Sequence, residues 1–413
     1  MKTDSSAGIS AWTPRTIHRM LDQRGKVGHN AETGPAPIHH ALARLVNKML
    51  KNELSEDVRD LFCESRLCWV DKKDIPGARP ISMDCAFLRF LYTCCKGDLD
   101  DKLMVEMGDT QLAIGERDGT EILGRFLDAA YQAGMTVTVL DAQNAYGNTK
   151  RGALFAELNR IAPEYLALYR FQYGGKRKIR NNQGVVVKVT ETSLKQGCPL
   201  SGDYYILANG AMMKQLNAEL KESEEEIRSQ GEIIMEGGAY GYLDDTYVVN
   251  DAKVTGTNTP KLAPAYAAHN AILCVPKSEI IGMGVYDHDD VPANWKISQE
   301  GGVAVGVPFG DRHWKIQHIK EELEKKYPPK LALSILTPRL VVALIILSYS
   351  RRASYLIKSS NNLLDVLPLA ELFDRAMVEA LANVARVNVT DVITTLINLP
   401  HRYGGAGLDT ASL

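Results

Sequence analysis

The stretch Gly237-Gly-Ala-Tyr-Gly-Tyr242-Leu-Asp244-Asp245-Thr-Tyr-Val-Val-Asn250 decides how this chain folds. Glycines lead into two adjacent carboxylates, and an apolar, β-prone run follows them. That order predicts two strands joined by a tight turn that carries Asp244 and Asp245. Neighbouring carboxylates repel each other unless a cation lies nearby, and Mg²⁺ takes carboxylate and phosphate oxygens as ligands. The turn is therefore either an ordinary solvated hairpin or a magnesium site, and the rest of the chain must distinguish the two.

The bulk composition is that of a folded protein. The chain has 413 residues, of which 45% are hydrophobic and 24% charged, so it can form two or three lobes with a large core. The formal net charge is −2, which gives no overall attraction to nucleic acid. Any surface that binds nucleic acid must therefore be local.

Cysteine usage and hydropathy bear on the compartment. The seven cysteines form no paired Cys-x-x-Cys pattern, so a structural zinc is not expected. An odd cysteine count without an apolar N-terminal signal segment suits a reducing compartment. The longest apolar run, residues 340–347, is far shorter than the ~20 residues that span a bilayer. We expect an intracellular protein, in nucleus or cytoplasm, that is neither secreted nor bound to a membrane.

The pattern along the chain predicts an α+β fold. Residues 1–35 are weakly patterned and form a lead-in segment. Residues 36–310 mix helical periodicity with β-rich runs, among them 136–141 and a hairpin over 174–195. Residues 311–413 are helical almost throughout, with breaks expected at Pro328-Pro329, Pro368 and Pro400.

A third carboxylate changes the interpretation of the acidic turn. Asp141 ends the β-rich run, and a carboxylate there would more often cap a helix or form a turn. Together with Asp244 and Asp245, however, it completes the three carboxylates that two-metal phosphoryl transfer requires. The 103 residues between Asp141 and Asp244 leave room for a helix pair and a hairpin, so the two strands can lie side by side.

The segment Gln196-Gly-Cys-Pro-Leu-Ser201-Gly joins the predicted hairpin to a helix. Gly197 allows the backbone to approach a ligand closely, and Pro199 makes the turn rigid. Such a junction can support a base pair or a template strand. It can equally be a turn that starts a helix.

These segments together resemble a known family. Leu140-Asp-Ala-Gln-Asn-Ala-Tyr146, Gln196-Gly-Cys-Pro-Leu-Ser201 and Tyr242-Leu-Asp-Asp245 are similar, in order, to the palm motifs of reverse transcriptases. More narrowly, they resemble the non-LTR retrotransposon enzymes. Shorter stretches over roughly residues 65 to 410 agree in order: 73–81, 111–115, 119–121, 276–279, 306–310 and 399–408. The chain departs from the family at Gly202-Asp203, where the family usually has Pro and an apolar residue.

The resemblance implies a right-hand polymerase, with fingers and palm over residues 36–310 and a helical thumb over 311–413. Asp141, Asp244 and Asp245 would bind two Mg²⁺ ions, with Mn²⁺ as an alternative. The backbone at Ala142 would face the incoming triphosphate. Tyr146 matches the steric gate, a ring under the sugar that clashes with a 2′-hydroxyl and so favours dNTPs.

Further roles follow from the same resemblance. Lys73 and Arg79 would neutralise the triphosphate, since Arg suits bidentate phosphate contacts. Lys277 would lie near the pyrophosphate as a general acid or an electrostatic partner. Gln196, Gly197 and Pro199 would hold the template and the nascent base pair. The thumb would lie along the duplex and contribute these lysines: Lys315, Lys320, Lys325, Lys326 and Lys330.

The implied function is that of an RNA-directed DNA polymerase. It would extend a DNA or RNA primer on an RNA template with dNTPs, as part of a non-LTR retrotransposon. One alternative is a catalytically dispensable scaffold in a ribonucleoprotein, which the near-neutral charge favours. The other is an RNA-dependent RNA polymerase, which would prefer rNTPs.

Overall fold

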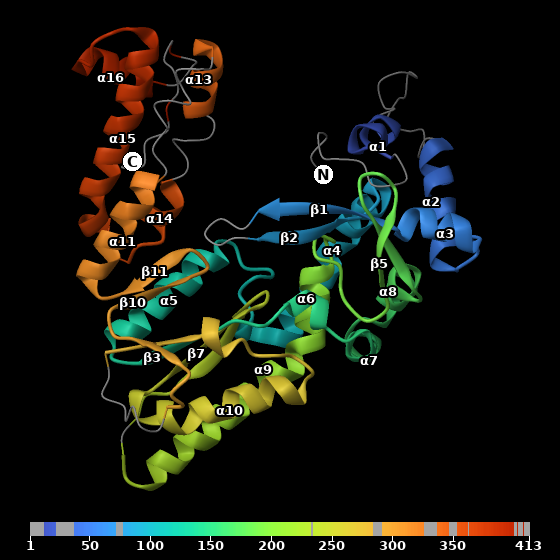
Figure 1. Ribbon diagram of the computed structural model, residues 1–413, viewed down its shortest axis with the longest axis horizontal. Helices are drawn as coiled ribbons and strands as arrows, with labels where there is room; N and C mark the ends of the chain where they lie inside the picture. Colours follow the sequence, from blue (N-terminus) through green and yellow to red (C-terminus); the bar gives the residue numbers. More distant parts are fainter. Residues whose placement is uncertain are drawn as a thin grey trace, which may run out of the picture.

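The computed structural model describes residues 12–21, 37–71, 77–232, 234–283, 291–325, 337–346, 353–361, 363–399, 403 and 408. Figure 1 shows a five-stranded sheet low in the molecule, a four-stranded sheet with its helices to one side, and C-terminal helices to the other. The predicted α+β class is confirmed. Two lobes flanking a mainly antiparallel sheet form the arrangement expected of a right-hand polymerase.

The five-stranded sheet has the order β6-β7-β3-β8-β9. Its strands are β3 (Thr136–Leu140), β6 (Gly238–Tyr242), β7 (Asp245–Asn250), β8 (Glu279–Ile281) and β9 (Lys296–Ser298). β3 lies in the middle and pairs antiparallel with both β7 and β8, while β9 joins β8 in parallel. Two segments more than 100 residues apart in the sequence are thereby hydrogen-bonded neighbours.

Alternating side chains on β3 explain why both faces of this sheet are covered. Leu140 packs with α9 (Ser201–Ser229) and α10 (Thr255–Ala268) in one cluster of buried residues. Val137, on the opposite face, packs with α5 (Gly119–Gln132) and with the hairpin β10 (Gly301–Ala304) and β11 (Val307–Gly310). Because side chains alternate along a strand, a sheet buried on both faces is apolar at nearly every position.

The four-stranded sheet has the order β2-β1-β4-β5. Its strands are β1 (Ser65–Asp71), β2 (Ala78–Met83), β4 (Arg177–Arg180) and β5 (Val186–Thr190). The helices on this side are α1 (Pro14–Leu21), α2 (Pro37–Leu50), α3 (Glu56–Cys63), α4 (Ala86–Met107), α7 (Arg151–Ile161) and α8 (Leu166–Tyr173). One large buried cluster joins these helices to the start of α9, so this lobe is packed directly onto the five-stranded sheet's own helix.

The C-terminal lobe is helical, as predicted. It consists of α11 (Arg312–Lys325), α13 (Pro338–Leu344), α14 (Ser354–Lys358), α15 (Leu363–Ala385) and α16 (Asp391–Asn398), which share one buried cluster. The predicted break at Pro368 is wrong, because α15 continues through it. The proline lies in the second turn, and the buried Val366, Ala370 and Phe373 hold that turn against the rest of the lobe.

The other two predicted breaks, at Pro328-Pro329 and Pro400, lie outside the described residues, and the three domain boundaries stay predictions. Among the described helices, none combines the length and the apolar character needed to cross a bilayer.

Candidate active site

The strand register brings the three carboxylates to one end of the five-stranded sheet. Leu140 pairs with Thr246 at the end of the β3–β7 ladder, so Asp141 and Asp245 follow at the same edge. Tyr242 pairs with Asp245 across the β6–β7 hairpin, which leaves Leu243 and Asp244 as the two turn residues. The strand–turn–strand predicted from the sequence is therefore present, with the acids at the turn.

The 242–245 turn is held in place by Gln111. Leu243 has a φ of +56°, a left-handed backbone conformation that a branched residue rarely adopts. Its amide donates to the side chain of Gln111 at 3.0 Å, and the amide of Leu112 donates to Gly241 at 2.9 Å. The Leu243 side chain packs against the cluster that contains the start of α9. These contacts fix the direction in which Asp244 and Asp245 leave the sheet.

Asp141 is fixed by the segment that precedes β8. The amide of Cys274 donates to the Asp141 carbonyl at 2.8 Å, and the Asp141 amide donates to the Ser278 hydroxyl at 3.2 Å. The same segment brings the Lys277 ammonium to 3.4 Å from Asp141 Oδ2. Apart from this ion pair, Oδ2 is buried and accepts no hydrogen bond from the described residues.

Desolvation and neighbouring negative charges raise the pKa values of Asp244 and Asp245. Desolvation and the negative charge of Asp141 raise the pKa of Asp244, against an opposing effect of Arg79. Asp245 is more exposed to solvent than Asp244, but its side chain lines the same cavity as Asp141 and Asp244. Desolvation there, followed by the charges of Asp244 and Asp141, raises the pKa of Asp245 to about 6. A site that holds like charges together in this way favours a bound cation or a proton.

The donor set fits a hard divalent cation. Three carboxylates share one recess, and one of their oxygens is a buried acceptor without a hydrogen bond from the described residues. Among the described cations, Lys277 and Arg79 lie near enough to offset their charge. Oxygen ligands of this kind suit Mg²⁺ and Mn²⁺. Within the described part of the chain, however, no three acidic, His or Cys side chains already stand at metal-binding geometry. A cation would therefore have to draw these carboxylates together.

Tyr146 lies beside the acids on the short helix α6 (Ala145–Asn148). Its ring contacts that of Tyr205, with centroids 5.4 Å apart, and its carbonyl accepts from the amide of Leu194 at 2.9 Å. Desolvation and the charges of Asp244 and Asp245 raise the pKa of Tyr146, so the phenol stays neutral. The ring has the position predicted for it, next to the carboxylates.

The 196–201 turn forms the opposite border of the site. The carbonyl of Gln196 accepts from the amide of Ser82 on β2 at 2.7 Å. Gly197 has a φ of +109°, and a Cβ there would stand 2.8 Å from the side chain of Ile81. The chain therefore needs glycine at this point for both conformation and space.

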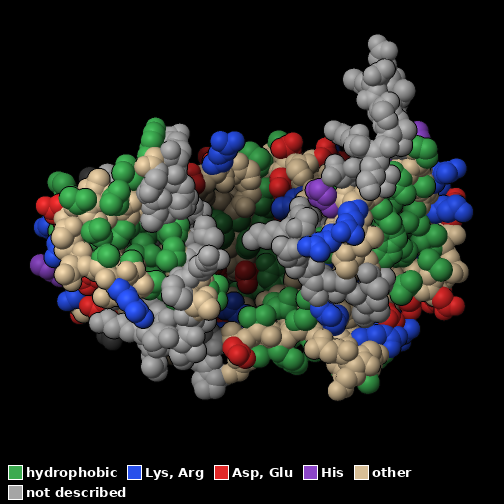
Figure 2. Space-filling view, turned by 90° about the horizontal axis from the view of Figure 1, so that it is seen from above, with side chains coloured by type: hydrophobic (Ala, Val, Ile, Leu, Met, Phe, Trp, Pro, Cys, Tyr) green, Lys and Arg blue, Asp and Glu red, His purple; other side chains and the backbone are tan. Residues whose placement is uncertain are grey.

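One cavity of about 850 Å³ collects nearly all the predicted site residues. In Figure 2 the hollow between the lobes has acidic side chains at its floor. The predicted residues that line this cavity are Arg79, Asp141, Ala142, Tyr146, Gln196, Gly197, Asp244, Asp245 and Lys277. Pro199 is half-buried and does not line it, and Lys73 lies outside the described residues.

Residues that support the site were missed from the sequence. Gln111 holds the acidic turn and Tyr205 backs the Tyr146 ring, yet neither was predicted as a site residue, although Gln111 begins the 111–115 stretch that resembles the family. Tyr205 lies shortly after Gly202-Asp203, where the sequence departs from the family pattern. That departure is the sequence signal that marks this part of the chain. Among the lysines expected on the thumb, Lys315 is paired within the protein, because its ammonium donates to both carboxylate oxygens of Asp128 at 2.7 Å.

Comparisons with known proteins add little to this picture. No protein-family model matches the chain, and no curated protein matches it. Among solved structures it is similar to telomerase from Candida albicans in complex with the TWJ fragment of telomeric RNA. The identity is 10% and the TM-score 0.44, over 87% of this chain and 64% of that one. This chain thus spans less than two thirds of that telomerase chain, and a similarity of this degree carries no functional assignment.

Proposed function

We propose that the protein is an RNA-directed DNA polymerase that extends a DNA or RNA primer with dNTPs on an RNA template. The observation that carries the proposal is the meeting of Asp141, Asp244, Asp245 and Tyr146 in one cavity, from segments more than 100 residues apart. A solvated hairpin would need none of these neighbours.

Each wall of the cavity has a part in nucleotidyl transfer. Asp141, Asp244 and Asp245 would hold Mg²⁺ or Mn²⁺, which when bound activates the attacking 3′-oxygen and steadies the leaving pyrophosphate. Arg79, exposed on β2, would neutralise the triphosphate from the opposite wall. Lys277 would donate a proton to the pyrophosphate or neutralise its charge.

Tyr146 supports the choice of dNTPs. Its ring is backed by Tyr205 and its carbonyl is bound by the chain that enters the 196–201 turn, so the ring has little freedom to move away. A 2′-hydroxyl placed over such a ring would clash with it. The turn itself, at the other side of the cavity, would support the template and the nascent pair through Gln196 and Gly197, with Pro199 behind them.

The order of the motifs supports an origin in a non-LTR retrotransposon. The near-neutral net charge is the feature that favours a scaffold in a ribonucleoprotein instead. Such a scaffold would not require carboxylates with raised pKa values in an open cavity. The raised pKa values mean that ionising these carboxylates costs free energy, and a catalytic role would explain why they are nevertheless placed together.

Primer extension by the purified chain tests the proposal. A labelled DNA primer is annealed to an RNA or a DNA template and supplied with Mg²⁺ and either dNTPs or rNTPs. We expect extension on RNA with dNTPs. A preference for rNTPs would indicate an RNA-dependent RNA polymerase. No extension under any of these conditions would favour the scaffold.

A further inference from the structure

A buried ion pair lies directly behind the 196–201 turn. The Lys195 ammonium is 2.8 Å from Asp84 Oδ1, and the two side chains are 1% and 0% exposed. Both charges have been removed from water, which is costly unless they are well paired. None of the proposed catalytic roles uses either residue.

The pair joins three segments that are distant in the sequence. The Lys195 ammonium also donates to the carbonyl of Cys63 at 2.7 Å, at the end of α3. Asp84 follows β2, and its Oδ1 accepts a second bond, from the Ser65 hydroxyl at 2.6 Å. Lys195 therefore ties the start of the 196–201 turn to α3, β1 and the end of β2.

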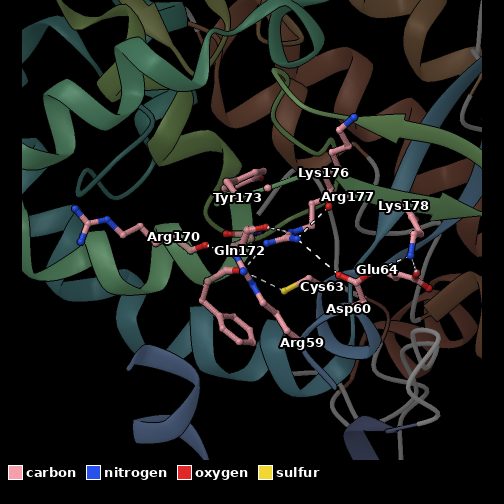
Figure 3. A network of polar contacts seen from close by, with 12 residues as sticks. Arg59, Asp60, Cys63, Glu64, Arg170, Gln172, Tyr173, Lys176, Arg177 and Lys178 are labelled. Carbon is pink, nitrogen blue, oxygen red and sulfur yellow. Dashed lines mark hydrogen bonds and ion pairs between the residues drawn. The ribbon is translucent and has the colours of Figure 1, made fainter. Parts of the chain in front are cut away.

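Polar contacts continue from Cys63 to the segment that contains Gln172 and Arg177 (Figure 3). The Cys63 thiol donates to the carbonyl of Phe171 at 3.3 Å, and the Arg177 guanidinium donates to the same carbonyl at 2.9 Å. The next residue, Gln172, donates from its side chain to Cys198 Sγ at 3.0 Å. Burial raises the pKa of Cys63 to about 11 and that of Cys198 to about 12, so both stay neutral thiols in this network.

The backbone around Lys195 reaches two groups of the proposed site. Leu194, one residue before it, donates its amide to the carbonyl of Tyr146 at 2.9 Å. Gln196, one residue after it, accepts from Ser82 on β2, the strand that carries Arg79. A shift of Lys195 would therefore move the Tyr146 ring relative to Arg79.

We propose that the Lys195–Asp84 pair is a positioning device that sets the spacing between Tyr146 and Arg79. Through that spacing it determines sugar selectivity and nucleotide affinity, an inference that rests on the proposed polymerase function. Packed apolar side chains can replace a buried ion pair at little cost in stability, so stability alone does not account for the pair. A charge pair differs from such side chains in fixing distance and direction.

The test compares three variants with the wild-type chain. Lys195→Met keeps the length of the side chain and removes the charge. Because that variant leaves a buried carboxylate unpaired and can fail to fold, Lys195→Met is also combined with Asp84→Asn. Lys315→Met is the matched control, since it breaks the Lys315–Asp128 pair, whose side chains are 17% and 5% exposed, outside this network.

Two readouts separate positioning from a merely structural role. The first is kcat and KM for single-nucleotide extension with a dNTP and with the matching rNTP. The second is hydrogen exchange at the amides of Leu194 and Ser82, whose bonds the pair is proposed to protect. Exchange needs no activity, so it tests the pinning of the turn even if the polymerase function is wrong.

The double variant is expected to raise KM for the dNTP and to lose selectivity against the rNTP by ~10- to 100-fold, the usual effect of misplacing a reacting group. Its kcat is expected to change less, and both amides to exchange faster. The control is expected to keep the selectivity and both exchange rates. Wild-type selectivity and exchange in the folded double variant would overturn the inference. A wild-type chain that extends no primer would overturn the proposed polymerase function and the predicted effect on sugar selectivity. The hydrogen-exchange rates would then decide by themselves whether the ion pair holds the 196–201 turn in place.

Discussion

The 242–245 turn and the 196–201 turn border the same cavity, yet their polar groups are satisfied to very different degrees. Beside the first turn, Asp141 Oδ2 forms an ion pair with Lys277 but accepts no hydrogen bond from the described residues. Within the turn, the pKa values of Asp244 and Asp245 are raised. At the second turn, Gln196, Cys198 and Ser201 all have hydrogen-bond partners, and a buried ion pair lies behind them.

This difference in hydrogen bonding indicates that the two turns have different roles. Groups that must bind a cation or a reacting phosphate cannot already be paired within the protein, and the cost appears as raised pKa values. Groups that must hold others in place are mostly paired, although Asp84 Oδ2 and Gln172 Oε1 are buried without a hydrogen bond from the described residues. We therefore propose that the acidic turn takes part in the chemistry and that the 196–201 turn positions other groups. Each of the following predictions changes one side of that comparison.

The largest effect is expected at the acidic turn. Asp244→Asn should lower the rate of primer extension by at least roughly 10²- to 10³-fold, the usual loss when a group that stabilises transition-state charge is removed. Stability should stay the same or rise, because the variant relieves repulsion from Asp141. Extension rates and thermal unfolding measure the two effects. Undiminished extension would remove the acidic turn from the chemistry.

The buried pair should dominate stability on the other side. Lys195→Met should lower the free energy of unfolding by about 3–5 kcal/mol, because it leaves Asp84 charged and unpaired in the core. Adding Asp84→Asn should recover a large part of that loss. Urea unfolding of both variants measures the change. A loss below about 1 kcal/mol for the single variant would place the pair among weak surface-like interactions.

The Tyr146 ring lies where the two turns meet. Tyr146→Ala should raise rNTP incorporation relative to dNTP incorporation by about 10- to 100-fold, in the range that steric discrimination supplies. Tyr205→Leu should give a smaller increase in the same direction, because it removes the ring that backs Tyr146. Tyr205→Phe keeps that ring and serves as the control. An unchanged sugar preference in Tyr146→Ala would show that the gate assignment is wrong.

Asp203 is another buried carboxyl beside the 196–201 turn, and its effect should be the smallest. It is buried in the first turn of α9, with Oδ1 paired to Lys96 at 2.5 Å and Oδ2 without a hydrogen bond from the described residues. Burial raises the pKa of Asp203 from 3.8 to about 6, although the Lys96 pair opposes the shift. A carboxyl with a raised folded-state pKa favours folding at low pH, and this contribution is lost as pH rises between about 4 and 6.

Asp203→Asn should therefore match wild type in stability near pH 4 and exceed it by about 1–3 kcal/mol near pH 7. Unfolding free energies of both proteins at the two pH values measure the difference. The opposite trend, with the variant weaker at pH 7 than at pH 4, would mean that the Lys96 pair outweighs the burial of the carboxylate.

Much of this comparison is visible in the sequence. The alternation of 136–140 and the glycine–acid–apolar order of 237–250 predict two strands, and their pairing follows once both must be buried. The three carboxylates and the 196–201 segment are visible as local patterns, whereas Tyr146 is recognised only through the family resemblance. All of them line the cavity except Pro199 and Leu200 of the 196–201 segment.

The supporting residues could not be predicted in the same way. The contact between Lys195 and Asp84 spans 111 residues, and that between Gln111 and Leu243 spans 132, so no local pattern connects either pair. Local breakers also mislead, because helices α10 and α15 contain Pro260, Pro264 and Pro368 within their bounds. Tertiary packing holds these helices where propensity alone would end them.

Divalent-ion binding tests the assignment of the acidic turn most directly. Mn²⁺ can be titrated into the purified chain and the free ion followed by electron paramagnetic resonance, with no need for template or nucleotide. We expect the wild-type chain to bind Mn²⁺, the Asp244→Asn and Asp141→Asn variants to lose that binding, and the Lys195→Met/Asp84→Asn variant to keep it. Equal Mn²⁺ binding by the wild-type chain and both carboxylate variants would contradict the account.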